Sequence, residues 1–340
     1  MSYIPNKIVG DETLFKDEAF DSIPSSLGRL CKDQALWVRA NQLAPNEKMA
    51  LFDTIEPNDI LQGGLGDCWL LSAISALAEF PTYLENIFLN NTLSVDGKYV
   101  IKLYDASLKR WIEVTIDDRI PCKKINSLKP IPLYSRMHDN EIYVLLLEKA
   151  FAKMSGSYEN LNGGHPASAW LALTGCENID MWSRENDIWH GLYFNVNAYR
   201  KTPWNFQKVP FSPKNTEQNS LEMFDLLKES DESNFVMEAA IINRGNPEHE
   251  RPDGLIELHA YSLISIYRDE HHQLVQLRNP WGDWHEWKGE WADDSESWEL
   301  FPEIKKKLNP EQKNDGLFWM SVENFMNIFN NVQICKKSFK

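Results

Sequence analysis

The sequence predicts an α+β fold in which helices dominate the first half and antiparallel strands dominate the second. Residues 142–154 repeat apolar side chains at helical spacing, and another apolar helix is predicted to begin at Cys68. After the pair Gly163-Gly164 the chain becomes rich in β-forming segments. With 340 residues and 43% hydrophobic composition, the chain is long enough to bury a large core.

A single cysteine stands where a glycine-rich loop is predicted to become a helix. Residues 62–68 read QGGLGDC, and Asp67 or Gly66 is the expected cap. A buried stripe is predicted to follow, formed by Trp69, Leu70, Ala73, Ile74, Leu77 and Ala78. The positive helix terminus favours a thiolate, and such positions lower a cysteine pKa from about 8.5 to about 3.5–7.5. Most cysteines are small buried hydrophobes, but this setting favours a nucleophile, and Gln62 is placed to stabilise an oxyanion.

A histidine and an asparagine are predicted to meet on one hairpin late in the chain. Residues 255–267 and 273–279 are strand-like, and the charged residues 268–272 between them form a turn. With the turn centred near Glu270, residues whose numbers sum to about 540 lie opposite each other, which pairs His259 with Asn279. An asparagine there would hold the imidazole in the tautomer that faces a thiol. Each residue alone has a structural explanation, as a core histidine or a strand-ending turn, but their opposition favours a catalytic pair.

The order Cys, His and Asn, with Gln shortly before the Cys, is the papain-like arrangement. Three local blocks closely resemble the catalytic blocks of the calpain family: DILQGGLGDCWLL (59–71), HAYS (259–262) and RNPWG (278–282). Four further blocks are also similar to calpains: TLFKDEAF (13–20), LEKAFAK (147–153), GSYE (156–159) and DGLFWMS (315–321). The blocks follow the family order from about residue 13 to 335.

This resemblance implies a two-lobed papain-like protease core with its site between the lobes. The implied division is an N-terminal extension (1–12), a helical lobe with the nucleophile (13–164), a β-rich lobe with His and Asn (165–335) and a tail (336–340). Cys68 is then the nucleophile, His259 the base, Asn279 its orienting partner, and Gln62 with the Cys68 N–H the oxyanion hole. The substrate-binding residues implied are Gly66, Gly164 and Trp281, the last packing beside the His–Asn pair. Residues 243–254 match a substrate-gating loop of the family, although an exposed loop is the simpler interpretation.

Calpain cores also bind two calcium ions, and the resemblance carries over their ligands. The first site would use Asp59 and Glu141, with carbonyl groups of residues 52–54. The second would use Glu286, Asp293 and Asp315. In a chain with 50 acidic residues, any one carboxylate is more often a solvated surface charge.

Four departures from the family pattern bear on these expectations. Leu317 replaces a calcium-ligating glutamate, and Pro57 replaces the arginine that pairs with that glutamate between the lobes. The segment from Gly282 to Glu286 is one residue longer than usual. These three weigh against the second site and against coupling between the sites. Leu258 stands where glycine is usual, which affects substrate fit near His259.

Composition limits the other classes of function. A net charge of −15 argues against nucleic acid and anionic membranes as main partners. The five cysteines, at positions 31, 68, 122, 176 and 335, contain no CxxC pair and suit a reducing compartment. We therefore expect a cytoplasmic protein with no signal peptide, no membrane insertion and none of the accessory domains of animal calpains.

The leading hypothesis is an intracellular calpain-like cysteine endopeptidase that makes limited, calcium-dependent or calcium-modulated cuts in other proteins. One alternative is a calpain-like binding or scaffold protein with little catalysis, and another is a calcium-independent protease. A papain-like acyl transferase is a further option, which the Asn-Pro-Trp block at residues 279–281 disfavours because such enzymes usually orient the histidine with Asp.

Overall fold

The computed structural model describes residues 13–29, 35–44, 47–123, 130–243, 248–282 and 285–340. The predicted extension at residues 1–12, Cys31, and the middle of the longer segment after Gly282 lie outside these ranges. The helices are α1 (Pro24–Leu27), α2 (Cys68–Ala78), α3 (Pro81–Glu85), α4 (Tyr143–Ser155), α5 (Pro166–Thr174), α6 (Val196–Tyr199), α7 (Ser220–Glu232), α8 (Ser297–Leu300), α9 (Pro302–Leu308) and α10 (Val322–Ile328).

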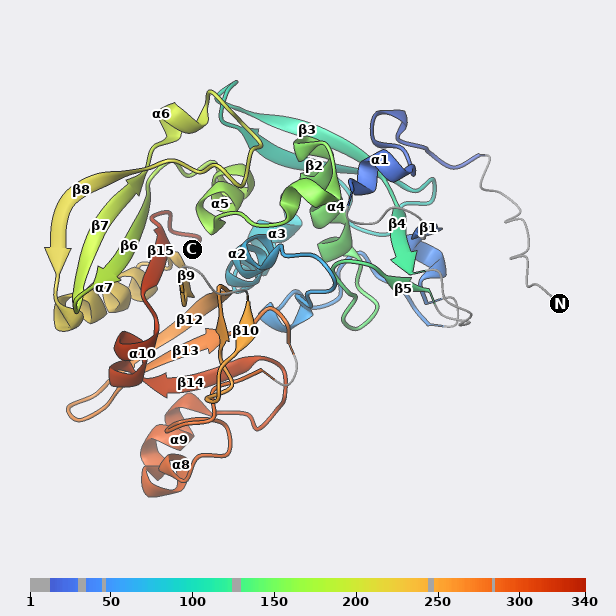
Figure 1. The fold of residues 1–340 in the computed structure, drawn as a ribbon. Coiled ribbons are helices and arrows are strands. Elements are labelled where there is room, and N and C mark those ends of the chain that lie inside the picture. The colour runs from blue at the N-terminus through green and yellow to red at the C-terminus, as the bar shows by residue number, and fades with distance from the viewer. Residues whose placement is uncertain (1–12, 30–34, 45–46, 124–129, 244–247, 283–284) are drawn as a thin grey trace.

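The strands confirm the predicted α+β class. They are β1 (Ala35–Arg39), β2 (Lys98–Asp105), β3 (Arg110–Asp117), β4 (Arg119–Lys123), β5 (Ile131–Pro132), β6 (Ile179–Glu185), β7 (Ile188–Phe194), β8 (Phe211–Gln218), β9 (Val236–Ala240), β10 (His249–Glu250), β11 (Ile256–Glu257), β12 (Ala260–Arg268), β13 (Gln273–Arg278), β14 (Leu317–Ser321) and β15 (Asn331–Cys335). In Figure 1 the helices α2 to α5 lie above and beside strands β12 to β14.

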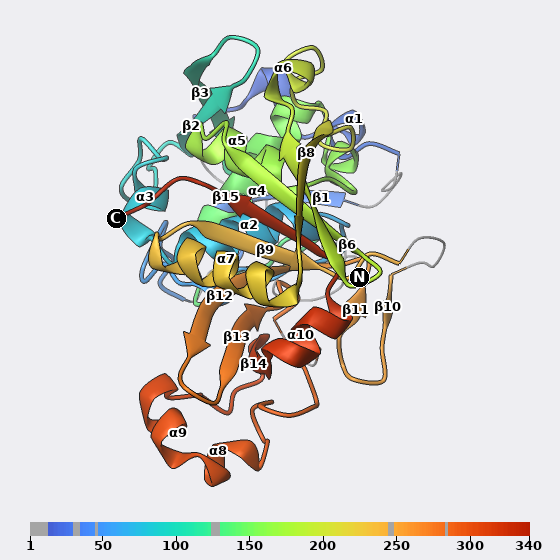
Figure 2. The same cartoon turned by 90° about the vertical axis from the view of Figure 1, so that its left-hand side faces the viewer.

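One antiparallel sheet organises the second half of the chain. Its order is β14-β13-β12-β9-β15-β6-β7-β8, so the late strand β15 lies between β9 and β6. Alternate residues of β9 point to opposite faces. Met237 and Ala239 pack in one apolar cluster with Met223 and Phe224 of α7, whereas Glu238 lines a pocket beside Cys68 on the other face. Figure 2 shows α7 running along the sheet.

The predicted helix after the glycine-rich loop is present as α2, with Cys68 as its first residue. The predicted buried stripe is confirmed, and the burial extends around the helix to all ten residues from Trp69 to Ala78. The reason is position, because α2 contacts α3 and α5 as well as strands β9 and β12. Asp67 holds the N-cap position, which confirms one of the two predicted caps, although its side chain accepts no cap hydrogen bond.

The loop before α2 approaches its neighbours too closely for side chains. A Cβ at Gly63 would lie 1.5 Å from the backbone oxygen of Tyr134, and one at Gly164 would lie 2.4 Å from the Trp69 ring. Because they lack a side chain, these glycines allow residues 163–164 and the loop before α2 to pack closely around the start of that helix.

Strands β12 and β13 form the predicted hairpin. Ser262 pairs with Arg278 and Leu263 with Leu277, each pair summing to 540 as expected, before a one-residue shift between Leu263 and Ser265. His259 precedes β12 directly and Asn279 follows β13 directly. The hairpin thus places both residues at the same end of the sheet, beside α2.

The largest apolar cluster extends across the predicted division between residues 164 and 165. It joins α2 and α4 residues with Trp170, Phe206 and Cys335 from the later half. The lobe boundaries therefore stay a prediction. Among the described residues, no helix combines the length and the apolar character needed to cross a bilayer.

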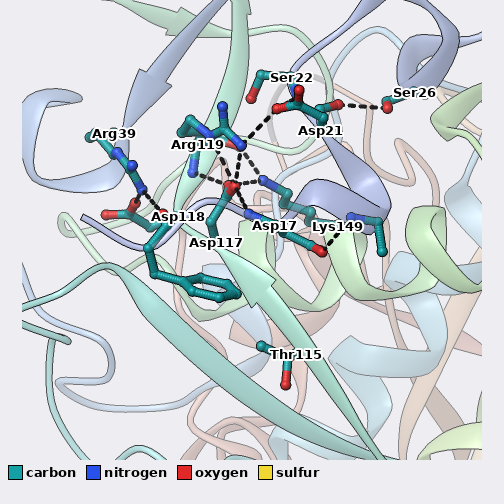
Figure 3. Close-up of polar contacts among 12 residues, drawn as sticks. Asp17, Asp21, Ser22, Ser26, Arg39, Thr115, Asp117, Asp118, Arg119 and Lys149 are labelled. Atoms are coloured by element: carbon teal, nitrogen blue, oxygen red, sulfur yellow. Dashed lines mark hydrogen bonds and ion pairs between the residues drawn. The ribbon is translucent and has the colours of Figure 1, made fainter. Parts of the chain in front are cut away.

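A buried network of ion pairs and hydrogen bonds around Asp117 connects segments of the first half of the chain (Figure 3). Asp117 accepts from the Lys149 Nζ of α4 at 2.5 Å, from the Arg119 Nη2 at 2.5 Å and from the Asp17 backbone N–H at 2.8 Å. Burial acts to raise the pKa of Asp117, but Lys149 and Arg119 outweigh it and hold the pKa at about 2. The ionised carboxylate is therefore strongly favoured in the folded state.

Asp117→Asn is expected to lower the free energy of unfolding at pH 7 by about 2–3 kcal/mol. An unfolded aspartate has a pKa of about 3.9, so the stabilisation is fully present above about pH 4 and is lost as the pH falls toward about 2. Urea unfolding of parent and variant between pH 7 and pH 3 measures the difference. A stability gap that does not narrow below about pH 4 would contradict this account.

Candidate active site

The histidine and asparagine at the end of the hairpin make a short hydrogen bond. His259 Nε2 lies 2.7 Å from Asn279 Oδ1, and both residues are buried. The Asn279 amide is itself fixed, because its Nδ2 donates to the His285 carbonyl at 2.9 Å and its Oδ1 also accepts from the Trp281 N–H at 3.0 Å. The Trp281 ring packs 4.8 Å from the imidazole, as the sequence predicts. Nδ1 is left as the nitrogen available to a nucleophile.

Cys68 lies close to that imidazole. Its sulfur, a ring nitrogen of His259 and a carboxylate oxygen of Glu248 are all within 4.8 Å of one another. Removal from water raises the pKa of the Cys68 thiol to about 12, and the negative charges of Glu248, Asp67 and Glu238 add to this, although the Ala260 N–H opposes it. The expectation of a lowered thiol pKa at the helix terminus therefore does not hold in this conformation.

Glu248 occupies the place where the thiol would meet the imidazole. Its Oε1 lies 3.0 Å from His259 Nδ1, so both ring nitrogens face acceptors. While Glu248 holds this position, Nδ1 is engaged by the carboxyl group and is not free to accept the thiol proton. Glu248 belongs to the predicted gating loop, of which residues 244–247 are outside the described ranges. No pattern in the sequence indicates this contact.

Leu258 has a left-handed backbone, with φ of 55°. This explains why glycine is usual immediately before the histidine, since a non-glycine residue is strained in that region. Leu258 also lines the pocket beside Cys68.

The remaining predicted site residues differ in how they relate to the pocket beside Cys68. Gln62 is buried, its Nε2 donates to the Leu65 carbonyl at 2.7 Å, and its Oε1 has no partner among the described residues. Gly164 lines the pocket beside Cys68. Gly66 does not line it, and its N–H donates to Asn162 Oδ1 at 3.1 Å.

The first predicted calcium site contains two buried carboxylates held close together. Asp59 accepts from the Tyr143 hydroxyl at 2.8 Å, and the Asp53 N–H donates to Glu141. Burial, with the charge of Asp59, raises the pKa of Glu141 to about 8, and its Oε2 has no hydrogen-bond partner among the described residues. Two adjacent carboxylates with an unpaired buried oxygen fit a divalent cation.

The carboxylates of the second predicted set influence one another's charge, but among the described residues Glu286, Asp293 and Asp315 do not come together as three ligand atoms within 4.8 Å of one another. Burial raises the pKa of Glu286, and burial with the charges of Glu286 and Asp315 raises that of Asp293 to about 7. The Glu286 Oε1 accepts from the Gly316 N–H at 2.6 Å. The charge of Asp315 opposes ionisation of both Glu286 and Asp293, which a cation beside them would offset, although Leu317 stands at the position of the missing ligand.

A contact between the two halves of the chain stands near both acidic sets. Asn58 Nδ2 donates to Asp315 Oδ2 at 3.1 Å, and its Oδ1 accepts from Arg278 Nε at 3.1 Å. Arg278 is fully buried and donates further to the carbonyl groups of Ile60 and Asn58 and to Ser75 Oγ. Asn58 and Arg278 thus connect the two halves of this chain. Asn58 directly follows Pro57, the position at which the family pattern has the arginine that pairs with a glutamate between the lobes.

A cysteine at a helix start, close to a histidine that an asparagine orients, is the arrangement of papain-like cysteine proteases. Comparison of the sequence with known protein families identifies the family within that class. A family model for calpain family cysteine proteases matches residues 15–336, so the chain belongs to the calpain family.

Curated relatives agree with this assignment. A calpain of Schistosoma mansoni is 30% identical over 339 residues, 96% of this chain and 39% of the relative. The calpain-type cysteine protease DEK1 of Arabidopsis thaliana is 31% identical over 96% of this chain and 14% of its own length. The calpain-1 catalytic subunit of Macaca fascicularis is 31% identical over 95% of this chain and 42% of its own length. The chain therefore spans less than half the length of these relatives.

Proposed function

We propose that this chain is a cysteine endopeptidase that makes limited cuts in proteins, with Cys68, His259 and Asn279 as its catalytic residues. The observation that carries the proposal is the 2.7 Å bond between His259 and Asn279 beside the cysteine at the start of α2. With Nε2 bonded to Asn279, Nδ1 is the nitrogen that would act on the thiol once Glu248 has moved away, as general-base activation of a nucleophile requires.

In the proposed mechanism, a proton moves from the Cys68 thiol to His259 and then to the leaving amine. Glu248 leaves His259, and Nδ1 then takes the proton of Cys68 as the sulfur attacks the scissile carbonyl carbon. The Gln62 amide and the Cys68 backbone N–H stabilise the oxyanion. His259 returns the proton to the leaving amine, and water hydrolyses the thioester with His259 again as base.

Cleavage of casein by the purified chain under reducing conditions tests this function. We expect cleavage that iodoacetamide abolishes, because the reagent alkylates the nucleophilic thiol. Intact casein with and without alkylation, in calcium and in chelator, would contradict the proposal. That result would favour the alternative of a binding or scaffold protein, which the contact between Glu248 and His259 supports.

We further propose that calcium controls this activity through the two acidic sets. Asp59 and Glu141 would hold one ion, and Glu286, Asp293 and Asp315 the other, with carbonyl groups of residues 52–54 assisting the first. Bound calcium would supply the positive charge that lets these buried carboxylates ionise together. The Asn58 and Arg278 contacts would then join the two sites mechanically.

Asp59→Ala is expected to weaken calcium binding at the first site by at least about tenfold, since it removes a charged ligand. Isothermal titration and the calcium-induced rise in melting temperature measure this without relying on activity. Glu229→Gln, an exposed change on α7, is the charge-matched control. Superimposable titration curves for Asp59→Ala and parent would show that the first site is not functional.

A further inference from the structure

A pocket of about 420 Å³ opens beside Cys68 and His259. One face of the central sheet forms part of it, through Glu238 and Ala240 of β9, Asn331 and Gln333 of β15, and Met181 and Ser183 of β6. The remaining lining includes Gly164, Pro166 and Leu258. Because it adjoins the thiol, a substrate held for cleavage would place one of its side chains here.

Glu238 stands out among these residues as a buried acid. It is 1% exposed, and its Oε2 has no hydrogen-bond partner among the described residues. Its register neighbours are engaged elsewhere, because Ser262 Oγ donates to the Ser72 carbonyl at 2.9 Å and Gln333 Oε1 accepts from the Ala167 N–H at 3.1 Å. An unsatisfied buried carboxyl is costly, so a role for it is expected in a bound state.

The charges around the pocket leave Glu238 without a cation. Arg184 also lines the pocket, but its guanidinium is bonded to Asp187 Oδ1 at 3.1 Å and to the Asn327 carbonyl at 2.9 Å. Glu185 is a second acidic lining residue. A positively charged side chain of the substrate would therefore find an unpaired acceptor and a negative surrounding.

We propose that Glu238 makes this pocket selective for a lysine or arginine side chain near the scissile bond of the substrate. The proposal rests on the proposed protease function and adds a substrate class to it. A long cationic side chain that reaches Glu238 would form a charge-assisted hydrogen bond away from water. An uncharged side chain of similar length would fill the pocket but leave the carboxyl unpaired.

The protonation of Glu238 is consistent with this role. Burial raises its pKa well above the usual value, which favours the neutral acid when nothing is bound. Pairing with a cation favours the ionised form, because an opposite charge lowers a carboxyl pKa. Burial thus favours the neutral carboxyl in the empty pocket, and a basic side chain in the pocket would favour its charged form.

Peptides that differ at one position within three residues of the cleaved bond provide the test. We expect arginine at one position to raise kcat/KM about ten- to hundredfold over norleucine there. Glu238→Gln, which has the shape of the neutral acid, is expected to remove that preference while leaving cleavage of the norleucine peptide unchanged. Glu229→Gln, on the α7 helix, should retain the preference.

A binding measurement separates failure of this inference from failure of the protease function. In the Cys68→Ala background, fluorescence anisotropy compares arginine and norleucine peptides with Glu238 present or replaced by Gln. Tighter binding of the arginine peptide that needs Glu238 supports the pocket even if no peptide is cleaved. Equal binding of the two peptides, or a preference that survives Glu238→Gln in a variant with parental melting temperature, would overturn it.

Discussion

Cys68→Ala is expected to reduce proteolysis by at least about a thousandfold, which is the scale on which nucleophile removal acts in hydrolytic triads. The thiol is the only nucleophile close to His259 among the described residues, and no other side chain can replace its covalent step. Casein cleavage and kcat/KM for a peptide substrate measure the loss.

The fold should survive this change. Cys68 is only partly buried at the first turn of α2, and alanine suits a helix, so the melting temperature should shift little. Cys176→Ala, a change at a cysteine without a role in the site, is the matched thiol control. Residual cleavage in Cys68→Ala equal to the parent would exclude the catalytic assignment.

Arg278→Met is expected to lower the free energy of unfolding by about 3–5 kcal/mol, because it leaves several buried acceptors unpaired. Burial lowers the pKa of Arg278 to about 10, yet its guanidinium bonds to Asn58, Ile60 and Ser75 from the first half of the chain. Loss of these contacts should also disturb Asn279, the next residue, and reduce kcat. Urea unfolding and peptide kinetics measure the two effects.

Arg278→Lys separates charge from geometry. Lysine keeps the positive charge but has one nitrogen instead of a planar fork, so it should restore only part of the stability. If Arg278→Met cannot be purified, the lysine variant still reports on the contact. Full parental stability in either variant would mean that the guanidinium contacts contribute nothing to joining the two halves.

The sequence could predict what depends on local periodicity. The start of α2 at Cys68, the helix α4 and the β12–β13 hairpin all follow from apolar spacing and turn residues, and the hairpin register alone places His259 near Asn279. The extent of burial of α2 was not predictable in this way. It depends on packing against β9 and β12, which lie more than 150 residues away in the chain.

Contacts made by single side chains across the fold could not be predicted either. Glu248 reaches His259 because of the path of a loop, and nothing in its neighbours specifies that path. Glu238 had a visible signal, as a lone acid in an otherwise apolar strand, but its pocket exists only once β15 lies beside β9. The leucine at a position where glycine is usual indicated that Leu258 is unusual. Its left-handed backbone, with φ of 55°, could be seen only in the structure.

The burial of the Cys68 thiol also has a consequence for redox chemistry. Peroxides oxidise thiolates far faster than neutral thiols, through sulfenic acid to products that no reductant restores. With its pKa raised to about 12, Cys68 is almost entirely a neutral thiol at physiological pH. In this conformation, burial and, to a smaller degree, the charge of Glu248 keep the thiol neutral, so the protein is expected to carry its nucleophile in a form that resists oxidative damage.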